Sequence, residues 1–560
     1  LISLLHKTFD VQVKLHDLYE HSTVKALALF IEQSTQHNFS AIPVLANSQH
    51  YALSHAQQRM WLVSQMAGDT AYNMLSMTKI KGALNTRAFT QAWQQLCQRH
   101  EILSSYFVET DSLQQVVDLT MPLDCRIVNI HDSQLQALNT PVDPQEHNRF
   151  EEFCHAINGE NIDQAQYHSL YHYFLNAANH SFTLTAKQAP IRIDLICIGA
   201  EEFILLVNMH HIVTDGWSMG IVVDEFLSLY QSQLASSAKP LAALNIQYRD
   251  YAAWQLSQLN MTNSEPNQAK DYWLRYLAGE LESLDIPTDN PRPALQTFNG
   301  ASVKMQWSAN TVAKLNALAQ QHSTTLFGIL ASNLSLLMHK YSRQKDVRIG
   351  YPVANRTHAD TQPLIGFFVN TLVFRSQLEN QQALSYQDYL GQNANELKQQ
   401  QTFQDYPFDC LVKDLALPND LSRSAVFDVM LVLQNTQQSE LCVPINDDQA
   451  LTFNGIELAP RASQFDLTFQ FKQDKDGLNL GLIYNTNLFH RASMQAMVAH
   501  LHNLTLNTLH NTQQRLSDVT LLDYKTVSAL LDVNATDAEY PKQRSIADQF
   551  IAQAKQTPNL

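Results

Sequence analysis

The hydrophobic pattern of the first half centres on two short apolar runs, at residues 191–198 and 203–209. Apolar runs of this length, bounded by turn residues, are typical of buried strands. The second run leads into the segment His210-His211-Ile212-Val213-Thr214-Asp215-Gly216. We expect Ser218 to cap a helix after this turn, because apolar residues then recur at helical spacing, at Ile221, Val222, Phe226 and Leu229.

Periodic segments continue along the chain and mix helices with strands. Ser54 and Gln57 fit a capping box at the start of one helix. The other predicted helices lie near residues 89–99, 325–341 and 492–509, and further strands are predicted at 347–353, 367–374, 465–471 and 478–484. This mixture indicates an α/β fold of the sandwich type rather than a regular parallel α/β repeat.

Two polar regions interrupt these patterns. Residues 141–180 are rich in Gln, Asn, His and Tyr, with weak periodicity, and this composition predicts a surface insertion. Residues 1–36 predict a small helical piece, with Thr23 as a helix cap, that is too short to bury a core alone. The polar residues 37–50 predict a linker.

Length and charge narrow the class of protein. A chain of 560 residues is too long for one ordinary core, and it predicts several domains or two large lobes with appendages. The 37 Lys and Arg residues against 53 Asp and Glu residues give a formal net charge of −16, which argues against nucleic acid as a partner. No phosphate-binding loop occurs, so we expect no nucleotide cofactor.

The chain shows no pattern that indicates a membrane or an oxidising compartment. No run reaches about 18 uncharged apolar residues, and the first residues lack the features of a signal peptide. The six cysteines are scattered without a CxxC pair, which favours reduced thiols and gives no support to a zinc site. We therefore expect a cytoplasmic protein. Its abrupt first residues suggest a piece of a longer polypeptide.

The paired histidines are the leading candidates for chemistry. Neighbouring side chains on a strand point to opposite faces, so His210 and His211 cannot face the same cavity. One of them is expected to be structural, and the other is free to act as a general base at the strand end beside Asp215. The same divergence argues against a metal held by both histidines and Asp215.

Seven motifs in one order resemble the condensation domains of non-ribosomal peptide synthetases, over about residues 51–515. Two motifs depart from the family pattern: Ser104-Ser105 follow the second motif where Arg-Thr is usual, and Phe403 and Asp409 replace His and Glu at the ends of the sixth. The motifs are Ser54-His55-Ala56-Gln57-Gln58-Arg59-Met60-Trp61, Arg99-His100-Glu101-Ile102-Leu103, residues 209–218, Tyr248-Arg249-Asp250-Tyr251, residues 365–371, Gln404-Asp405-Tyr406-Pro407-Phe408, and residues 422–430.

The flanking segments resemble parts of neighbouring domains. Residues 1–36 resemble the last helices of a peptidyl carrier domain, without the GGxS motif whose serine bears 4′-phosphopantetheine. Residues 516–560, with Asn534-Ala535-Thr536 and Tyr540-Pro541, resemble the linker and start of an adenylation domain. The resemblance then implies a linker at 37–50, an N-lobe at 51–230 and a C-lobe at 231–515.

The resemblance implies two lobes like chloramphenicol acetyltransferase, set as a V-shaped pseudodimer around a tunnel. It implies a multidomain enzyme of antibiotic or other secondary-metabolite biosynthesis. The expected reaction is attack by the amine of an acceptor aminoacyl thioester on a donor thioester, both carried on phosphopantetheine arms. The expected partners are an upstream donor carrier domain, partly present, a downstream adenylation domain and an acceptor carrier domain. The first and fifth motifs favour an L-donor and L-acceptor subtype.

The resemblance also implies roles for the motif residues. His211 is the expected catalytic residue, as a base or as a hydrogen-bond acceptor that positions the amine, and the Gly216 N–H is expected near the developing oxyanion. His210 is expected to be structural. Asp215 is expected to form a buried salt bridge with Arg356, and Arg348 is the alternative partner.

Four further residues are candidates for the tunnel. Trp217 is expected to pack in the tunnel wall. Asn370 either lines the tunnel as a polar group or has a structural role at a strand end. Ser463 and Gln464 are expected to face the acceptor side. Arg59 and Arg99 are expected to be structural rather than catalytic.

Other functions on the same scaffold stay open. Epimerisation is disfavoured by the adenylation-like tail, and heterocyclisation by histidines where that subtype carries Asp. Modification of the donor residue alongside condensation is compatible with the sequence. A non-catalytic module that recruits carriers or tailoring enzymes is a further alternative, which the intact histidine motif disfavours.

Overall fold

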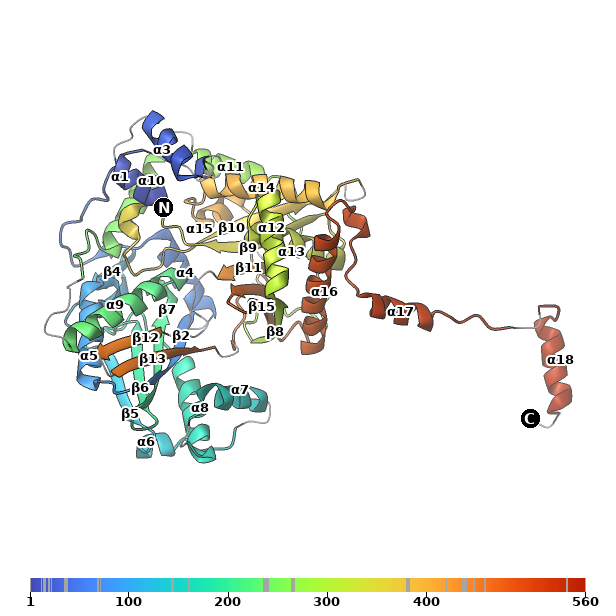
Figure 1. Cartoon of the computed structure of the whole chain (residues 1–560), viewed down its shortest axis with the longest axis horizontal. Helices are drawn as coiled ribbons and strands as arrows, with labels where there is room; N and C mark the ends of the chain where they lie inside the picture. Colours follow the sequence, from blue (N-terminus) through green and yellow to red (C-terminus); the bar gives the residue numbers. More distant parts are fainter. Residues whose placement is uncertain are drawn as a thin grey trace.

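The structure is a computed structural model, and Figure 1 shows the whole chain. It describes residues 2–11, 13, 17–18, 21, 23–34, 39–67, 70, 72–142, 146–159, 162–234, 241–262, 267–378, 383–418, 420–434, 441–446, 449–457, 460–539 and 542–558.

Two six-stranded mixed sheets organise the body, and the first is built mainly from the first half of the chain. Helices cover both of its faces: α5 (Thr86–Arg99) and α9 (Gly216–Leu234) lie on one, and α7 (His147–Ile157) and α8 (Gln164–Ala178) on the other. Its strands, in spatial order, are β12 (Leu441–Asn446), β13 (Gln449–Ile456), β2 (Asn73–Lys81), β7 (Glu202–His210), β6 (Ile191–Cys197) and β5 (Asp124–Asn129).

The second sheet packs against helices of the second half, and together they enclose a second hydrophobic core. The helices are α12 (Ala309–Gln321), α13 (Leu326–Ser342), α14 (Tyr386–Thr402) and α16 (Arg491–His510). The strand order is β10 (Asn370–Gln377), β9 (Asp346–Val353), β11 (Val429–Gln434), β14 (Leu467–Gln473), β15 (Gly477–Asn485) and β8 (Gly300–Ser308).

Shorter elements surround these two cores. A small antiparallel sheet has the order β1 (Tyr51–Ala52), β4 (Leu113–Val117) and β3 (Ser105–Glu109). The remaining elements of the body are α4 (His55–Ala67), η1 (Glu101–Ser104), α6 (Ser133–Gln136), η3 (His211–Val213), α10 (Tyr248–Thr262), α11 (Gln268–Tyr276), η4 (Ala359–Thr361), α15 (Phe408–Leu415) and η5 (Leu516–Asp518).

These two mixed sheets confirm the predicted α/β class with two lobes. Several local predictions are confirmed as well. The capping box is formed, because Gln57 N donates to Ser54 Oγ at 3.2 Å and Ser54 N donates to Gln57 Oε1 at 3.1 Å. Thr23 caps α3 (Val24–Gln33) by accepting from Ala26 N at 3.1 Å.

The predicted boundary between the two lobes, at residue 230, is wrong for three segments. They follow this residue in sequence but pack in the first lobe. Helix α10 contributes Tyr248 and Tyr251 to the first core, and residues 364–369 join it there. Strands β12 and β13 also follow residue 230 in sequence, yet β13 pairs with β2 and extends the first sheet. The second half of the chain therefore crosses to the first lobe. There β13 pairs with the edge of β2 that β7 leaves free.

The prediction of a polar surface insertion at residues 141–180 is wrong. Helices α7 and α8 bury Phe150, Phe153, Leu170 and Tyr171 against the far face of the first sheet. The segment also reaches the second lobe, where Glu146 pairs with Arg461 at 2.8 Å. The apolar periodicity of the segment is weak in part because tyrosines, which count as polar in a hydropathy pattern, share the packed face with Phe and Leu.

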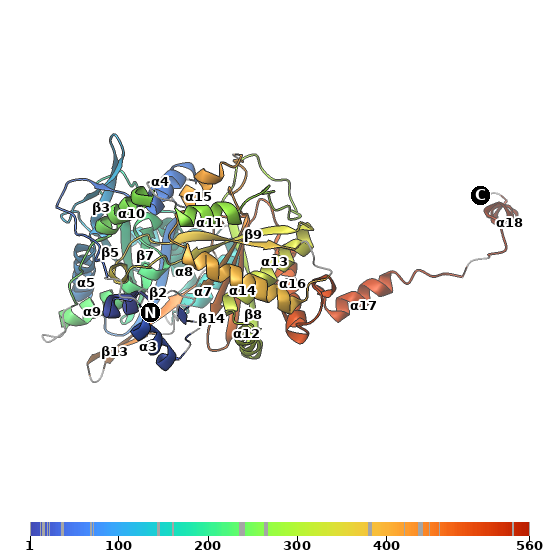
Figure 2. The ribbon, with the colours of Figure 1, turned by 90° about the horizontal axis from the view of Figure 1, so that it is seen from above.

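The two ends of the chain differ in how they contact the body. The N-terminal helix α1 (Ile2–Phe9) docks on η4, where Lys7 Nζ lies 2.9 Å from Asp360 Oδ1. At the other end, α17 (Tyr524–Val533) and α18 (Ile546–Gln556) contain no buried residue and project away from the body in two perpendicular views (Figures 1 and 2). Tyr540 and Pro541 lie outside the described residues.

Candidate active site

The end of β7 explains how the two histidines separate. Along β7, Phe203, Leu205 and Val207 face the core beneath α5 and α9, whereas Ile204 and Leu206 face α7 and α8. This alternation of side chains has a period of two. It places the fully buried His210 and the half-buried His211 in different surroundings.

The two histidines make different hydrogen bonds. His210 Nδ1 accepts from Ile212 N at 3.1 Å and stabilises the turn. His211 Nδ1 lies 2.8 Å from the carbonyl oxygen of Thr214. A carbonyl can only accept, so Nδ1 carries the proton and Nε2 of the neutral ring keeps its lone pair.

Burial lowers the pKa of His211 below its ordinary value of 6.5, and the hydrogen bond to Thr214 and the charge of Asp215 oppose this effect. The imidazole is therefore neutral near pH 7. Its ring lies edge-on to Phe367, with centroids 4.9 Å apart.

Asp215 closes the turn and caps the helix. Its Oδ1 accepts from Ser218 N at 2.8 Å, which is the geometry of an N-cap residue of α9. The prediction that Ser218 caps this helix is therefore wrong. Ser218 lies in the first helical turn, and its hydroxyl donates to Gly366 O at 2.9 Å.

Asp215 also holds the crossing segment 364–369. Its Oδ2 accepts from Phe368 N at 2.9 Å, and its Oδ1 lies 3.5 Å from Arg356 Nη2. The side chain of Asp215 is fully buried. Because His211 Nδ1 is committed to Thr214, Asp215 acts on that ring only through its charge.

The partner of Asp215 is Arg356 rather than Arg348. The guanidinium of Arg356 also donates to Ser218 Oγ, Thr361 O and Leu364 O, at 2.8, 2.5 and 2.8 Å. By contrast, Arg348 Nε donates to Val426 O at 2.9 Å, and its ion pair is with Asp346.

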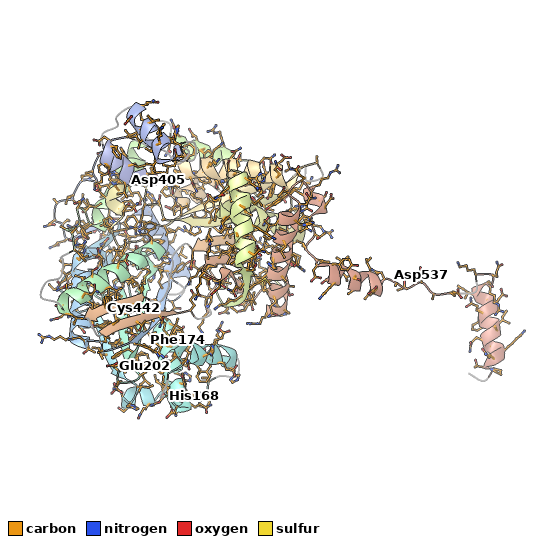
Figure 3. All side chains as sticks on the ribbon, viewed as in Figure 1. His168, Phe174, Glu202, Asp405, Cys442 and Asp537 are labelled. Atoms are coloured by element: carbon orange, nitrogen blue, oxygen red, sulfur yellow. The ribbon has the colours of Figure 1, made fainter. Side chains whose placement is uncertain are left out.

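His211 lines a cavity of about 1590 Å³ between the two lobes. Pockets for single small molecules usually measure about 300–1,000 Å³, so this cavity has room for a larger or an extended ligand. Helix α8 contributes Phe174, which Figure 3 labels. The wall draws on both lobes, with Tyr72, Asn73, Phe367, Thr371, Ser463, Gln464 and Thr468 among its residues.

Asn370 has its polar groups engaged within the protein. Its Nδ2 donates to Gln404 O at 2.8 Å and Tyr406 O at 2.7 Å, and its Oδ1 accepts from Phe408 N at 3.1 Å. Although Asn370 borders the cavity, these contacts favour the structural alternative, in which it fixes the segment before α15.

Ser463 and Gln464 both line the cavity, as expected of residues that face a substrate. The Ser463 hydroxyl donates to Phe465 O at 2.6 Å, and Gln464 O accepts from Gln296 Nε2 at 3.0 Å. Their assignment to the acceptor side stays a prediction.

Trp217 and Gly216 lie outside the cavity wall. The Trp217 side chain is 48% exposed and stands over Arg356, 5.9 Å from the ring centroid to Cζ, so the expectation that it packs in the wall is wrong. Gly216 is exposed at the first residue of α9, where the N–H groups of a helix lack intrahelical partners. An oxyanion contact from Gly216 therefore stays a prediction.

Two glycines of the motifs should respond differently to a methyl group. A Cβ at Gly366 would stand 1.9 Å from the Tyr248 ring, whereas a Cβ at Gly216 would meet no atom within 4 Å. We expect Gly366→Ala to lower the free energy of unfolding by about 1–3 kcal/mol and Gly216→Ala to change it little. Urea unfolding of both variants measures this difference, and equal stabilities would contradict the packing at Gly366.

A second group of titratable side chains lies at the edge of the cavity. Here α4 and α15 bring together His55, Asp409 and Cys410. The hydrogen bond to Asp409 is the main reason that the pKa of His55 rises to about 10. No spacing pattern indicates this group in the sequence, because His55 stands 354 positions before Asp409.

Comparison with known proteins relates the chain to one family. The family model described as "Condensation domain" matches residues 47–147 and 145–531. Bacitracin synthase 3 of Bacillus licheniformis is 32% identical over 561 residues, which span 100% of this chain and 8% of that protein. Tyrocidine synthase 3 of Brevibacillus parabrevis is 30% identical over 563 residues, 100% of this chain and 8% of that protein. The chain therefore spans only a small part of the relatives that it matches.

Solved structures share the fold. The X-domain from teicoplanin biosynthesis has a TM-score of 0.71 at 22% identity, covering 86% of this chain and 100% of that one. A four-domain non-ribosomal peptide synthetase, holo-AB3403, has a TM-score of 0.71 at 19% identity, covering 87% and 35%. The family model covers most of the sequence, and residues of five of the seven motifs line the cavity that His211 borders. The chain belongs to the condensation domain family.

Proposed function

We propose that the chain forms an amide bond between a donor acyl thioester and the amine of an acceptor aminoacyl thioester. The observation that carries this proposal is His211, which lines a cavity between the lobes as a neutral ring with the Nε2 lone pair unprotonated. A neutral imidazole beside a large cavity can accept a proton or a hydrogen bond from a bound amine.

In the proposed reaction the amine nitrogen attacks the thioester carbonyl, the C–N bond forms and the C–S bond breaks. His211 Nε2 accepts a hydrogen bond from the amine and takes its proton as the nitrogen becomes positive. The thiolate that leaves then takes up a proton. A thioester is already activated, so orientation of the two reactants supplies a large share of the rate enhancement, up to about 7–11 kcal/mol.

The residues behind His211 position it rather than react. Thr214 O fixes the tautomer, and Asp215 holds both the turn and the segment that carries Phe367 and Phe368. The guanidinium of Arg356 ties Asp215 to residues 361–364. This arrangement ties the histidine turn to a segment that packs in the first core and carries Phe367 and Phe368 of the cavity wall.

We place the chain within a larger synthetase. Both substrates would be carried on 4′-phosphopantetheine arms of carrier domains, and the cavity volume suits two such extended chains. Residues 1–36 are proposed as the end of the donor carrier domain and residues 516–560 as the linker and start of an adenylation domain. An L-donor and L-acceptor subtype remains our proposal from the motifs.

The alternative is a module that recruits another protein without catalysis. The chain shares its fold with an X-domain whose structure was solved in complex with OxyB, at 21% identity and a TM-score of 0.70. The tautomer of His211 and its place in the cavity favour catalysis instead.

Amide formation between loaded carriers tests the proposal. The chain, within its parent module, would be mixed with a donor carrier bearing an acyl thioester and an acceptor carrier bearing an aminoacyl thioester, in deuterated water. Intact-protein mass spectrometry should show the extended acyl chain on the acceptor carrier. Deuterium at the donor α-carbon without extension would indicate epimerisation, and neither product would leave the recruitment module as the better account.

The lowered pKa of His211 predicts its titration behaviour. The pKa of His211 in the folded chain lies below 6.5. The ring should therefore stay neutral, and able to accept a proton from the amine, as the pH falls through 6.5. As the pH falls, His211 is protonated at a higher pH in the unfolded chain than in the folded chain, so its protonation lowers the free energy of unfolding. NMR titration of the His211 ring, assigned by its loss in His211→Gln, should give a midpoint below that of a histidine in a peptide. A midpoint at or above about 6.5 would contradict the burial effect.

A further inference from the structure

A second cluster of side chains joins the two lobes beside the cavity. His55 is the first residue of α4, and Asp409 and Cys410 lie in the first turn of α15. The His55 Nδ1 atom lies 2.9 Å from Asp409 Oδ2 and 3.6 Å from Cys410 Sγ, and the sulfur lies 3.9 Å from the same carboxylate oxygen. A nitrogen, an oxygen and a sulfur atom therefore converge on one small volume.

The spacing of these atoms fits a metal ion. The point equidistant from all three lies about 2.0 Å from each, and a small displacement out of their plane lengthens these distances to about 2.1–2.3 Å. Zinc is bound at about 2.0–2.2 Å by His nitrogen and carboxylate oxygen and at about 2.3 Å by cysteine sulfur. The three ligand atoms would need to move only a few tenths of an ångström.

The chemistry of the donors selects the ion. Imidazole and thiolate are ligands for zinc and related transition ions, whereas magnesium and calcium prefer sets of oxygen atoms. Zinc binds the unprotonated imidazole and the thiolate, so binding releases the protons that these ligands carry. We propose that His55, Asp409 and Cys410 form a zinc site with three protein ligands and one open position.

The site is accessible and is separate from the His211 turn. The side chains of His55 and Asp409 are 21% and 30% exposed, so an ion can reach them from solvent. Cys410 is free of a disulfide. Asp409 also lines the cavity, which places the ion at the edge of the cavity wall.

The position of the site assigns it a structural effect. Helix α4 packs on η3 in the first lobe, and α15 packs on β10 and α11 in the second. An ion bound between α4 and α15 would therefore cross-link the lobes at the cavity. It would limit how far they separate, without taking part in bond formation.

Cobalt substitution tests this site directly. Co²⁺ added to the metal-free full chain should bind with one equivalent that shows a thiolate-to-cobalt charge-transfer band, and Zn²⁺ should displace it. Cys410→Ser should remove the band, and His55→Asn should weaken Zn²⁺ binding at least about 100-fold, since loss of an outer partner alone costs about 10- to 100-fold. Circular dichroism would confirm that both variants are folded.

The matched control is Cys442→Ser, which removes an exposed thiol on β12 (Figure 3). This variant should keep the band and the affinity for Zn²⁺. Cobalt bound without a thiolate band, or a band that persists in Cys410→Ser, would overturn the proposal. The same conclusion would follow if the wild-type chain bound no equivalent of either ion.

Discussion

Replacement of His211 by Ala should lower the rate of amide formation by about 100- to 10,000-fold, the range expected when a general base is removed. The cavity should persist, because the ring lies on its wall, where it meets Phe367 edge-on. The variant loses the Nε2 atom. In the wild-type ring this atom stays unprotonated because the proton is held on Nδ1 by Thr214 O. Single-turnover transfer between preloaded carriers measures this rate without product release.

The matched control for this variant is His500→Ala. His500 is a half-buried histidine on α16 whose ring shares a hydrogen bond with the Tyr341 hydroxyl outside the cavity. It should transfer at the wild-type rate. A His211→Ala variant that is folded and retains more than about one tenth of the wild-type rate would show that the ring contributes little beyond packing.

Replacement of Arg356 by Ala should lower the free energy of unfolding by about 3–5 kcal/mol, the cost of breaking a buried ion pair from one side. Asp215 would remain fully buried without its countercharge, and the carbonyl groups of Thr361 and Leu364 would lose their donor. Urea unfolding followed by circular dichroism measures the loss. The rate of amide formation should fall as well, because Asp215 holds the turn of His211.

An exposed ion pair gives the control for Arg356→Ala. Arg126 Nε lies 2.8 Å from Asp124 Oδ1 with half of the arginine side chain exposed. Its replacement by Ala should cost no more than about 1 kcal/mol. Similar losses in both variants would mean that the Arg356–Asp215 pair contributes no more than a surface pair.

The histidine turn can be predicted from the sequence because its causes are local. A continuous apolar run predicts a buried strand, and the period of two then separates His210 from His211. The helix that follows is predictable for the same reason. Its cap is Asp215 instead of Ser218, since both residue types favour that position and only the backbone geometry decides between them.

Contacts between distant segments cannot be predicted in this way. The sequence leaves Arg356 and Arg348 as alternative partners of Asp215, and the choice depends on how β9 ends beside the first lobe. Asn370 has the same ambiguity, since an amide that caps a loop and one that meets a substrate look alike in sequence. The cluster of His55, Asp409 and Cys410 forms only when the two lobes meet.

The segments that cross between the lobes are the part of the fold that the sequence hides most. Strands β12 and β13 belong to the second half of the chain, where no strand is predicted over residues 441–456, and β13 pairs with β2 of the first sheet. Burial of α7 and α8 is hidden in part because Tyr side chains count as polar in a hydropathy pattern, although Tyr171 packs with Phe153 in the core behind the sheet.

The most direct test of the central claim is a crystal structure of the chain with an aminoacyl-pantetheine in which an amide replaces the thioester. If His211 positions the amine, the amine nitrogen should lie within hydrogen-bond distance of Nε2, about 2.6–3.2 Å. The ring should keep its Nδ1 contact with Thr214 O. An amine bound in the cavity beyond the reach of His211, with the ring turned to another partner, would contradict the account.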